Sequence, residues 1–290
     1  MLYFGYGSNL CAADLAAWCH ERGLPPIRLT RAGAAFLPDR RLAFTHRSTT
    51  RDGGVLDIPE ARGCAVAGVL FRGVSADERA TLDRKEGDGH AYERVELVAL
   101  TDDGAEVPVF TYQVIPEHRN AFVAPTRAYV DVVRRGLAEH GLATDVLDAI
   151  ARDISHSGPI DRIFVYGTLR RGEARHHALT RHGARGGERG VTLGRLLDLG
   201  SYPGLVLDDP QRTVAGEIYA TPDPDALFAD LDAIEAFRGF GVPGSLYRRA
   251  IVLVRPDDGD MAPTWTYVYG GPRDGSRVIA SGDWLDRERP

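Results

Sequence analysis

Lysine is almost absent from this 290-residue chain, because 34 of its 35 basic residues are arginine and only Lys85 is lysine. Alanine and glycine are abundant, and this combination is typical of a GC-rich bacterial coding sequence rather than of a particular function. A surplus of positive charge is also missing, since 41 acidic residues give a net charge of −6. Proteins that bind nucleic acid usually carry a basic excess or a basic face, so we expect no nucleic-acid partner.

Cysteine and long apolar runs are scarce as well. Cys11, Cys19 and Cys64 are odd in number and form no Cys-x-x-Cys pair, so we expect no disulfide framework and predict a reducing, cytoplasmic location. No run approaches 18 apolar residues, which predicts neither a transmembrane helix nor a membrane partner. The first residues lack the basic and apolar regions of a signal peptide.

Several common catalytic patterns are absent. No Gly-x-Ser-x-Gly elbow occurs, so a hydrolase triad lacks its nucleophile. His176, His177 and His182 have no acidic or cysteine partner at ligand spacing, which disfavours a metal site. Gly5 and Gly7 lack the third glycine of a dinucleotide-binding loop.

What the chain does contain is enough apolar sequence for two folded domains. Apolar residues make up 43% and charged residues 26%, close to globular averages, which excludes global disorder. A length of 290 residues favours two domains. Small and helix-breaking residues gather at 153–161, and the predicted domains are therefore 1–155 and 160–290.

An internal repeat supports this division. Four short blocks occur once in each half and in the same order, pairing residues 2–10 with 163–169, 81–86 with 230–235, 92–98 with 247–253, and 110–114 with 265–269. The last two blocks keep the same spacing in both halves, and the first two differ by a loop-sized length. Ordered matches of this kind indicate a duplicated domain.

Each half is predicted to be α+β, a small barrel or curled sheet with flanking helices. Alternating or β-rich runs predict strands within 66–71, 95–100, 107–112, 214–219, 250–254 and 265–269. Helices are predicted from the Ser75 capping box to Gly87, from 221–225 to Phe237, over 126–139, and over 144–154. The last of these is predicted to begin at Thr144, with Leu147, Ile150 and Ile154 facing inward.

The first repeated block is a candidate binding loop. A short strand ends in Tyr-Gly followed by Ser8 or Thr168 and turns towards a helix. Glycine permits a tight turn, and successive N–H groups at a helix start favour a carboxylate or an oxyanion. The alternative is an ordinary capped turn between strand and helix, which repetition makes less attractive.

The second block supplies a candidate acid/base in each half. Glu86 and Glu235 lie at the end of a predicted helix, where the negative end of the helix dipole opposes their charge. Asp83 and Asp232 lie one turn back and are expected to add like-charge repulsion. Both effects predict a raised carboxyl pKa, which suits a general acid/base near neutral pH. The alternative is a solvated helix face.

Four repeated tyrosines, Tyr92, Tyr112, Tyr247 and Tyr267, are expected in the core, with their hydroxyl groups turned towards a cavity.

These motifs resemble a known family. In residues 1–152 the segments Tyr6–Leu10, Gly53–Ile58, Leu82–Gly87, Pro125–Tyr129 and Glu139–Leu142 look like the γ-glutamylcyclotransferase family. In residues 161–285 the segments Tyr166–Gly172, Tyr202–Gly204, Leu231–Glu235, Ser245–Arg249 and Ser281–Trp284 resemble its AIG2-like branch, which includes γ-glutamylamine cyclotransferases. The chain departs from the pattern where Ala236 replaces a glycine, where the second loop lacks an Asn9 equivalent, and where the loop from Glu86 to Tyr92 is short.

The resemblance implies a tandem of two small mixed β-barrels with flanking helices and no cofactor. It implies a small-molecule γ-glutamyl substrate, whose free α-amino group attacks its own γ-amide carbonyl to release 5-oxoproline and an amine. Glu86 and Glu235 would be catalytic and no metal would be needed. The substrate-binding residues would be Tyr6, Gly7, Ser8, Asn9, Leu10 and Tyr92 in the first half, and Tyr166, Gly167, Thr168, Leu169 and Tyr247 in the second.

Two alternatives remain open at this point. One is a non-catalytic protein that binds a γ-glutamyl metabolite, and the other is an enzyme in which only one half is active. Presence of a glutamate in both halves favours catalysis, because a binding protein needs no carboxyl group with a raised pKa. The motifs make no prediction about the released amine or the oligomeric state.

Overall fold

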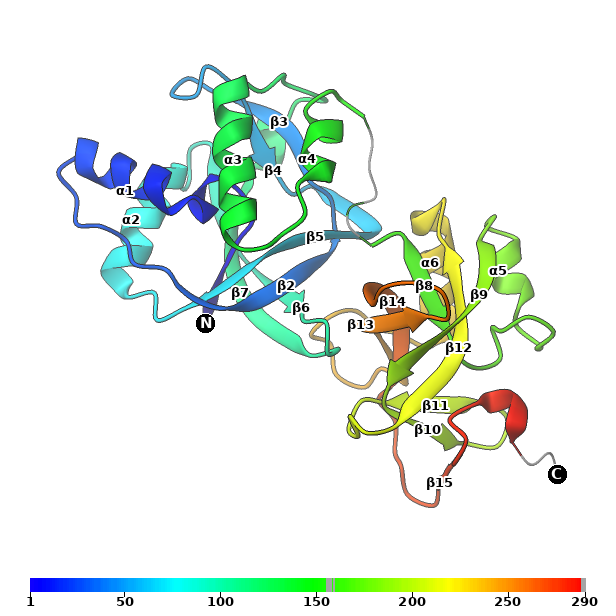
Figure 1. Cartoon of the computed structure of the whole chain (residues 1–290). Helices are drawn as coiled ribbons and strands as arrows, with labels where there is room; N and C mark the ends of the chain where they lie inside the picture. The colour runs from blue at the N-terminus through cyan, green and yellow to red at the C-terminus, as the bar shows by residue number, and fades with distance from the viewer. Residues whose placement is uncertain (155–157, 159, 288–290) are drawn as a thin grey trace. The chain divides into compact units, whose positions relative to one another are not determined.

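The computed structural model describes residues 1–154, 158 and 160–287 (Figure 1). The chain divides into two compact units, one formed by Met1–Ala99 with Val107–Pro159 and the other by Leu100–Glu106 with Ile160–Pro290. The predicted domain boundary falls largely on residues 155–157 and 159, which lie outside the described residues.

The first unit contains a closed five-stranded barrel with strand order β1-β5-β2-β6-β7 and a separate β3-β4 hairpin. Strand β1 pairs antiparallel with β5 and parallel with β7. Its strands are β1 (Leu2–Gly5), β2 (Thr30–Arg40), β3 (Ala43–Ser48), β4 (Gly53–Asp57), β5 (Glu60–Arg72), β6 (Tyr92–Leu100) and β7 (Glu106–Val114). Its helices are α1 (Ala12–Glu21), α2 (Ala76–Glu86), α3 (Arg127–Glu139) and α4 (Asp145–Ile150), with 3-10 turns η1 (Ser8–Leu10) and η2 (Pro116–His118).

The second unit repeats this plan with a closed barrel of order β12-β8-β14-β13-β9 and a small sheet of order β11-β10-β15. Its strands are β8 (Arg162–Val165), β9 (Arg185–Leu193), β10 (Arg195–Asp198), β11 (Pro203–Val206), β12 (Thr213–Ala220), β13 (Tyr247–Pro256), β14 (Ala262–Tyr269) and β15 (Arg277–Val278). Its helices are α5 (His177–Thr180) and α6 (Pro224–Ile234), with the 3-10 turn η3 (Trp284–Asp286). The predicted α+β tandem of small barrels with flanking helices is confirmed.

The duplication extends to individual glycines inside each barrel. A Cβ atom on Gly68 of β5 would lie 2.4 Å from the Phe4 ring. A Cβ atom on Gly216 of β12 would lie 2.6 Å from the Phe164 ring and 2.5 Å from the Val165 carbonyl oxygen. Glycine is therefore required at this point in both units, because it allows the buried aromatic residue of β1 or β8 to cross the neighbouring strand.

Equivalent hydrogen bonds hold the first strand of each barrel to its parallel neighbour. The Thr111 hydroxyl donates to the Phe4 carbonyl oxygen over 2.8 Å, and the Thr266 hydroxyl donates to the Phe164 carbonyl oxygen over 2.9 Å. All four residues are buried. Each pair ties chain segments that are about 100 residues apart, which fixes the start of the candidate binding loop relative to the barrel.

Helix α2 begins as its sequence predicts. The Ser75 hydroxyl accepts from the Glu78 backbone N–H, and the Glu78 carboxylate accepts from the Ser75 backbone N–H, which together form the capping box. Gly87 then ends the helix in the left-handed conformation. Helix α6 begins within the predicted segment 221–225, where the Asp223 side chain caps it, but regular helix ends at Ile234 and does not reach Phe237.

The prediction for the fourth helix is partly wrong. Leu147 and Ile150 are buried as expected, but α4 ends at Ile150 and the Ile154 side chain is 51% exposed. Thr144 occupies the N-cap position without a side-chain hydrogen bond to the helix. The first repeated block turns towards a helix as predicted, since η1 leads into α1, although no bounds were predicted for this helix.

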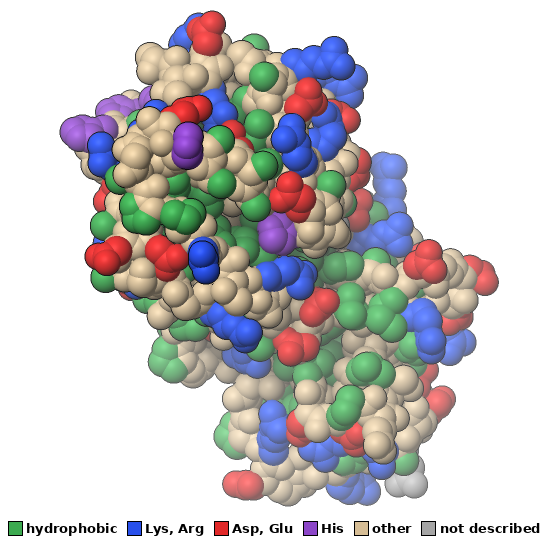
Figure 2. Space-filling model, turned by 60° about the vertical axis from the view of Figure 1, so that its left-hand side comes forward, with side chains coloured by type: hydrophobic (Ala, Val, Ile, Leu, Met, Phe, Trp, Pro, Cys, Tyr) green, Lys and Arg blue, Asp and Glu red, His purple; other side chains and the backbone are tan. Residues whose placement is uncertain are grey.

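Charges of both signs are mixed on the face drawn in Figure 2, where arginine side chains alternate with aspartate and glutamate. This distribution agrees with the modest net charge of −6. Among the described residues, no helix combines the length and apolar character needed to cross a bilayer.

Ala236 adopts a left-handed backbone conformation that is unfavourable for alanine, whereas the matching residue of the first unit is Gly87. Ala236 has a φ of 51°, and Gly87 has a φ of 67°. The left-handed conformation costs an L-residue about 1–2 kcal/mol, part of which is offset because glycine loses more entropy on folding. We expect Ala236→Gly to raise the free energy of unfolding by about 0.5–1 kcal/mol, measured by urea denaturation. A loss of stability would contradict this assignment, and Gly87→Ala is the reciprocal control, expected to destabilise.

Two candidate active sites

The loop after β1 is held close to the first barrel by helix α3. Gly136 of α3 faces η1 so closely that a Cβ atom there would lie 2.6 Å from the Cys11 backbone nitrogen. Within the loop, the Leu10 N–H donates to the Gly7 carbonyl oxygen, which forms the single 3-10 turn. The backbone of residues 7–9 therefore has a fixed position at the mouth of the barrel.

Helix α2 brings Glu86 to this loop. The Asn9 amide Nδ2 donates to Glu86 Oε1 over 2.8 Å and to the Tyr3 hydroxyl over 2.8 Å. The Glu86 side chain is 17% exposed, so its carboxylate is accessible from one side. The predicted catalytic residue Glu86 and the predicted binding segment Tyr6–Leu10 therefore lie together.

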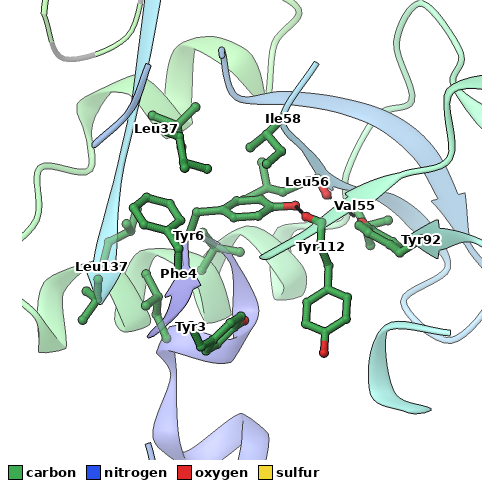
Figure 3. Packing of buried hydrophobic residues seen from close by; sticks show 14 of the residues in the cluster. Tyr3, Phe4, Tyr6, Leu37, Val55, Leu56, Ile58, Tyr92, Tyr112 and Leu137 are labelled. Carbon is green, nitrogen blue, oxygen red and sulfur yellow. Dashed lines mark hydrogen bonds between the residues drawn. The ribbon is translucent and has the colours of Figure 1, made fainter. Parts of the chain in front are cut away.

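Aromatic rings line the small inner pocket of the first unit. It has a volume of about 30 Å³ and is lined by Tyr3, Tyr6, Gly7, Ser8, Asn9, Leu56, Glu86, Tyr92, Tyr112 and Tyr129. The Tyr6 hydroxyl donates to the Tyr112 carbonyl oxygen over 2.7 Å, and the Tyr92 hydroxyl donates to the Leu56 carbonyl oxygen over 2.6 Å (Figure 3). Burial raises the pKa of both tyrosines well above its usual value, so both hydroxyls remain proton donors to the backbone.

The second unit contains the equivalent pocket, also of about 30 Å³. It is lined by Phe164, Val165, Tyr166, Gly167, Thr168, Leu169, Arg175, Tyr202, Pro203, Glu235, Tyr247 and Tyr267. The Tyr166 hydroxyl donates to the Tyr267 carbonyl oxygen over 2.7 Å, and the Tyr247 hydroxyl donates to the Pro203 carbonyl oxygen over 2.6 Å. The two pockets thus share the same pair of tyrosine-to-backbone hydrogen bonds.

The aspartate one turn before each glutamate is held by a tyrosine and an arginine. In the first unit, Asp83 accepts from the Tyr112 hydroxyl over 2.7 Å and pairs with Arg94 over 2.6 Å. This arrangement corrects the expectation that Asp83 repels Glu86, because the aspartate charge is compensated by its own partners. It also corrects the expectation for the Tyr112 hydroxyl, which donates to protein rather than facing the cavity.

In the second unit an aspartate is also held by a tyrosine and an arginine, and these groups are more deeply buried. Asp232 accepts from the Tyr267 hydroxyl over 2.7 Å and lies 3.7 Å from the Arg249 guanidinium. The Arg249 side chain is 0% exposed, and its guanidinium lies over the rings of Phe228, Phe237, Phe240 and Trp265. Asp232 is therefore not the source of a perturbed titration of Glu235.

Burial raises the pKa of the Glu235 carboxyl group. The residue is 7% exposed, and removal from water raises its carboxyl pKa from 4.5 to about 7, an effect that the nearby Arg175 guanidinium opposes. The predicted rise is confirmed for Glu235, with burial in place of like-charge repulsion as its cause. A carboxyl group with this pKa can both accept and donate a proton near neutral pH.

The two sites differ in the groups around the glutamate. Asn9, which donates to Glu86, is matched by Leu169 in the second loop, so Glu235 lacks that amide donor. Lys85, whose ammonium lies 3.8 Å from Glu86, is matched by Ile234. Glu86 is thus held among polar partners, and Glu235 lies in a more apolar setting beside Arg175.

Nearly all the residues predicted to bind substrate line one of the two pockets. Leu10 is different, because it is 1% exposed in the hydrophobic core and is not part of the pocket wall. Sequence reasoning did not assign a binding role to several lining residues, namely Tyr3, Leu56, Tyr112 and Tyr129 in the first unit and Phe164, Val165, Arg175, Tyr202, Pro203 and Tyr267 in the second. Leu56, Tyr129, Tyr202 and Pro203 fall within motifs that carry the family resemblance, which was the available signal.

No group of three or more histidine, cysteine, aspartate or glutamate side chains is arranged to hold a metal ion within the described part of the chain. His182 has an acidic partner from a distant part of the sequence, since its Nε2 atom contacts the Asp230 carboxylate. Arg181 pairs with the same carboxylate.

Comparison with known proteins gives the family. The sequence profile described as "Gamma-glutamyl cyclotransferase, AIG2-like" matches residues 3–130 and 163–286. These two segments make up most of the chain, one in each half. The protein therefore belongs to the AIG2-like gamma-glutamyl cyclotransferase family, as a tandem of two such domains.

Individual relatives match about half of the chain. It is 36% identical over 128 residues to the "Gamma-glutamylcyclotransferase family protein YtfP" of Escherichia coli, covering 44% of this chain and 99% of that protein. It is 33% identical over 123 residues to the "Gamma-L-glutamyl-butirosin B gamma-glutamyl cyclotransferase" of Niallia circulans, covering 42% of this chain and 74% of that protein. A solved structure described as "Gamma-glutamyl cyclotransferase" is 26% identical, with a TM-score of 0.44 over 53% of this chain and 88% of that chain.

The titration of Glu235 predicts a pH-dependent stability. A carboxyl group whose pKa is raised on folding binds more protons in the folded state, so stability falls as pH rises from 4.5 to about 7. A rise of this size corresponds to about 3 kcal/mol at most. Glu235→Gln should remove this dependence, so that its stability relative to the parent protein increases between pH 5 and pH 8 in urea denaturation. An equal difference at both pH values would show that Glu235 titrates normally.

Proposed function

We propose that this protein is a γ-glutamyl cyclotransferase that cleaves γ-glutamyl amides into 5-oxoproline and a free amine, with one active site in each unit. The observation that carries the proposal is the duplicated placement of a glutamate carboxylate beside a Tyr-Gly-hydroxyl loop in a tyrosine-lined pocket. The raised pKa of Glu235 supports a role in proton transfer. A relative named as acting on gamma-L-glutamyl-butirosin B supports the same class of substrate.

The chemistry requires little beyond a bent substrate and a mobile proton. The α-nitrogen forms a bond to the γ-carbonyl carbon, and the bond from that carbon to the amide nitrogen breaks. The α-ammonium nitrogen loses two protons as it becomes the ring N–H, and the departing nitrogen gains two protons and leaves as an ammonium group, so no water is consumed. Because both reacting groups belong to the same molecule, holding them in contact supplies a large part of the rate enhancement.

Glu86 and Glu235 are the groups that would move these protons. An ionised carboxylate accepts a proton from the α-ammonium group, and the resulting acid donates a proton to the leaving nitrogen. The pKa of about 7 matches Glu235 to both steps. In the first site, the Asn9 amide holds one carboxylate oxygen of Glu86, which orients the carboxylate towards the pocket.

The loop would stabilise negative charge on the γ-carbonyl oxygen. Among the described contacts, the backbone N–H groups of Ser8 and Asn9 have no protein acceptor, and the same holds for Thr168 and Leu169. These residues line the pockets, together with the glutamates. Fixed N–H donors that face a developing oxyanion lower the barrier for acyl transfer.

The direct test is incubation of the protein with γ-glutamyl amines and γ-glutamyl amino acids, followed by measurement of 5-oxoproline. Single Glu86→Gln and Glu235→Gln variants should each lose turnover at one site, and the double variant should lose it at both, by about 100-fold or more. A double variant that retains parent activity would contradict the proton-transfer role. If one single variant loses all activity, only that unit is catalytic.

The remaining activity of Glu86→Gln should report the titration of Glu235. Because the ionised carboxylate is the base, kcat/KM of this variant should rise with pH through about 7 and then level off. Below the pKa, the logarithm of kcat/KM is expected to rise with a slope of about one per pH unit, because a single proton is lost. A profile that is flat between pH 5.5 and pH 8.5 would mean that Glu235 is not the group that accepts the proton.

A further inference from the structure

The C-terminal segment Ser281–Arg287 has no part in the proposed reaction, although its first four residues form a motif that resembles the family. The segment contains the 3-10 turn η3, in which Trp284 is 1% exposed. Gly282 lets it approach strand β12 closely, because a Cβ atom there would lie 2.1 Å from the Thr213 carbonyl oxygen. The Gly282 carbonyl oxygen also accepts from the Ala215 N–H over 2.9 Å, so the segment is fixed to the second barrel.

The same segment holds the loop that follows the Tyr-Gly-Thr turn of the second unit. The Trp284 indole Nε1 donates to Glu173 Oε2 over 3.1 Å, and the Arg287 guanidinium lies 3.7 Å from the same oxygen. Asp283 accepts from Arg170 Nη1 over 2.5 Å, and the Arg170 side chain is only 4% exposed. Hydrogen bonds and ion pairs thus hold the loop at two points that are three residues apart.

This loop is closed by its own backbone hydrogen bonds and returns to the pocket. The Glu173 N–H donates to the Arg170 carbonyl oxygen over 3.0 Å, and the Arg175 N–H donates to the Thr168 carbonyl oxygen over 2.8 Å. Thr168 and Arg175 both line the second pocket together with Glu235. Fixing Arg170 and Glu173 therefore also fixes the part of the pocket wall that Thr168 and Arg175 form.

Arg175 supplies the positive charge that acts on Glu235 in this pocket. Its guanidinium favours the ionised carboxylate and so opposes the rise in pKa that burial causes. The other titratable groups near the carboxylate are four tyrosine hydroxyls and an aspartate whose charge is compensated by its own partners. They are Tyr166 after β8, Tyr202 before β11, Tyr247 of β13, Tyr267 of β14 and Asp232 of α6. The position of Arg175 therefore affects how readily Glu235 is ionised.

The first unit holds its corresponding loop in another way. Helix α3 packs against η1, and Glu139 of this helix accepts from the Ala12 N–H over 3.2 Å. Residues 281–287 belong to the second unit. Their contacts with the loop therefore concern one of the two candidate sites.

We infer that residues 281–287 act as a clasp for the second active site, and that Asp283 and Trp284 are positioning residues that hold Arg175 beside the Glu235 carboxylate. The inference rests on the proposed function of the second site. It makes second-site activity, but not first-site activity, depend on the C-terminal motif. Without the clasp, the Arg175 guanidinium is free to turn towards solvent, and burial then acts on the carboxyl group with less opposing charge.

The test uses the full chain with Glu86→Gln, so that only the second site turns over. Asp283→Asn removes the charge that pairs with Arg170, and Trp284→Phe removes the indole N–H while keeping an aromatic ring in the buried position. With both changes, the midpoint of the kcat/KM profile against pH should move above about 7 by about one pH unit. A shift of this size lowers kcat/KM at pH 7 about fivefold, and the loss should disappear near pH 9.

Two reference variants define what the clasp does. Arg175→Met should shift the midpoint in the same direction, and adding the clasp substitutions to it should cause no further shift, because the same guanidinium is already lost. Asp286→Asn is the matched control, since Asp286 is exposed and lies three residues from Asp283, and its profile should equal that of the background. In a Glu235→Gln background, which reports the first site, the clasp substitutions should leave kcat/KM unchanged.

A clasp variant that loses activity with an unchanged midpoint, or loses it at both sites, would show a purely structural role and overturn the inference. Titration of the Glu235 carboxyl group by ¹³C NMR gives the same decision without turnover, since its pKa should rise in the clasp variant and in Arg175→Met alike. If no γ-glutamyl compound yields 5-oxoproline, the proposed function fails, and this titration still decides whether the clasp positions Arg175.

Discussion

One connected set of hydrogen bonds holds each candidate site together. A tyrosine of the binding loop donates to the backbone of a tyrosine in the barrel, and the side chain of that second tyrosine donates to an aspartate on the helix that carries the glutamate. In the first unit the residues are Tyr6, Tyr112 and Asp83, and in the second they are Tyr166, Tyr267 and Asp232. The loop and the helix are therefore positioned by the same barrel strand, β7 or β14, although they are distant in sequence.

This arrangement explains how the site tolerates change around the glutamate. The compensating arginine is partly exposed Arg94 in the first unit and fully buried Arg249 in the second, yet the tyrosine-to-aspartate distance is 2.7 Å in both. With the helix end fixed, the environment of the carboxylate can differ. Glu86 has polar neighbours in Asn9 and Lys85, whereas Glu235 is buried and has a pKa of about 7. The two units thus share the scaffold and differ in the groups that surround the glutamate carboxylate.

Much of the fold could be predicted from the sequence because its signals are local or repeated. The Ser75 capping box marks α2, alternating residues mark six barrel strands, and the ordered blocks reveal two related units. Features that depend on tertiary contacts could not be read in this way. Ile154 lies beyond the end of α4, and the tyrosine and arginine partners of Asp83 and Asp232 compensate the charges whose spacing suggests repulsion.

In the candidate site, too, the residues that recur in the repeat could be predicted, and those that depend on tertiary contacts could not. The loop residues and both glutamates could be found because they recur at matching points of the repeat. Leu10 was placed in the binding loop by its neighbours in sequence, but its side chain packs in the core. Lys85 could be counted as the one lysine, but its burial beside Glu86 becomes visible in three dimensions.

The most direct measurement of the central claim is the fate of the atoms when a γ-glutamyl amide carrying ¹⁵N at its α-nitrogen is turned over in ¹⁸O-labelled water. Intramolecular attack predicts 5-oxoproline that retains ¹⁵N in its ring, contains no ¹⁸O and forms in equal amount to the released amine. Free glutamate that contains ¹⁸O would contradict the account, because it would show that water rather than the α-amino group attacks the γ-carbonyl carbon.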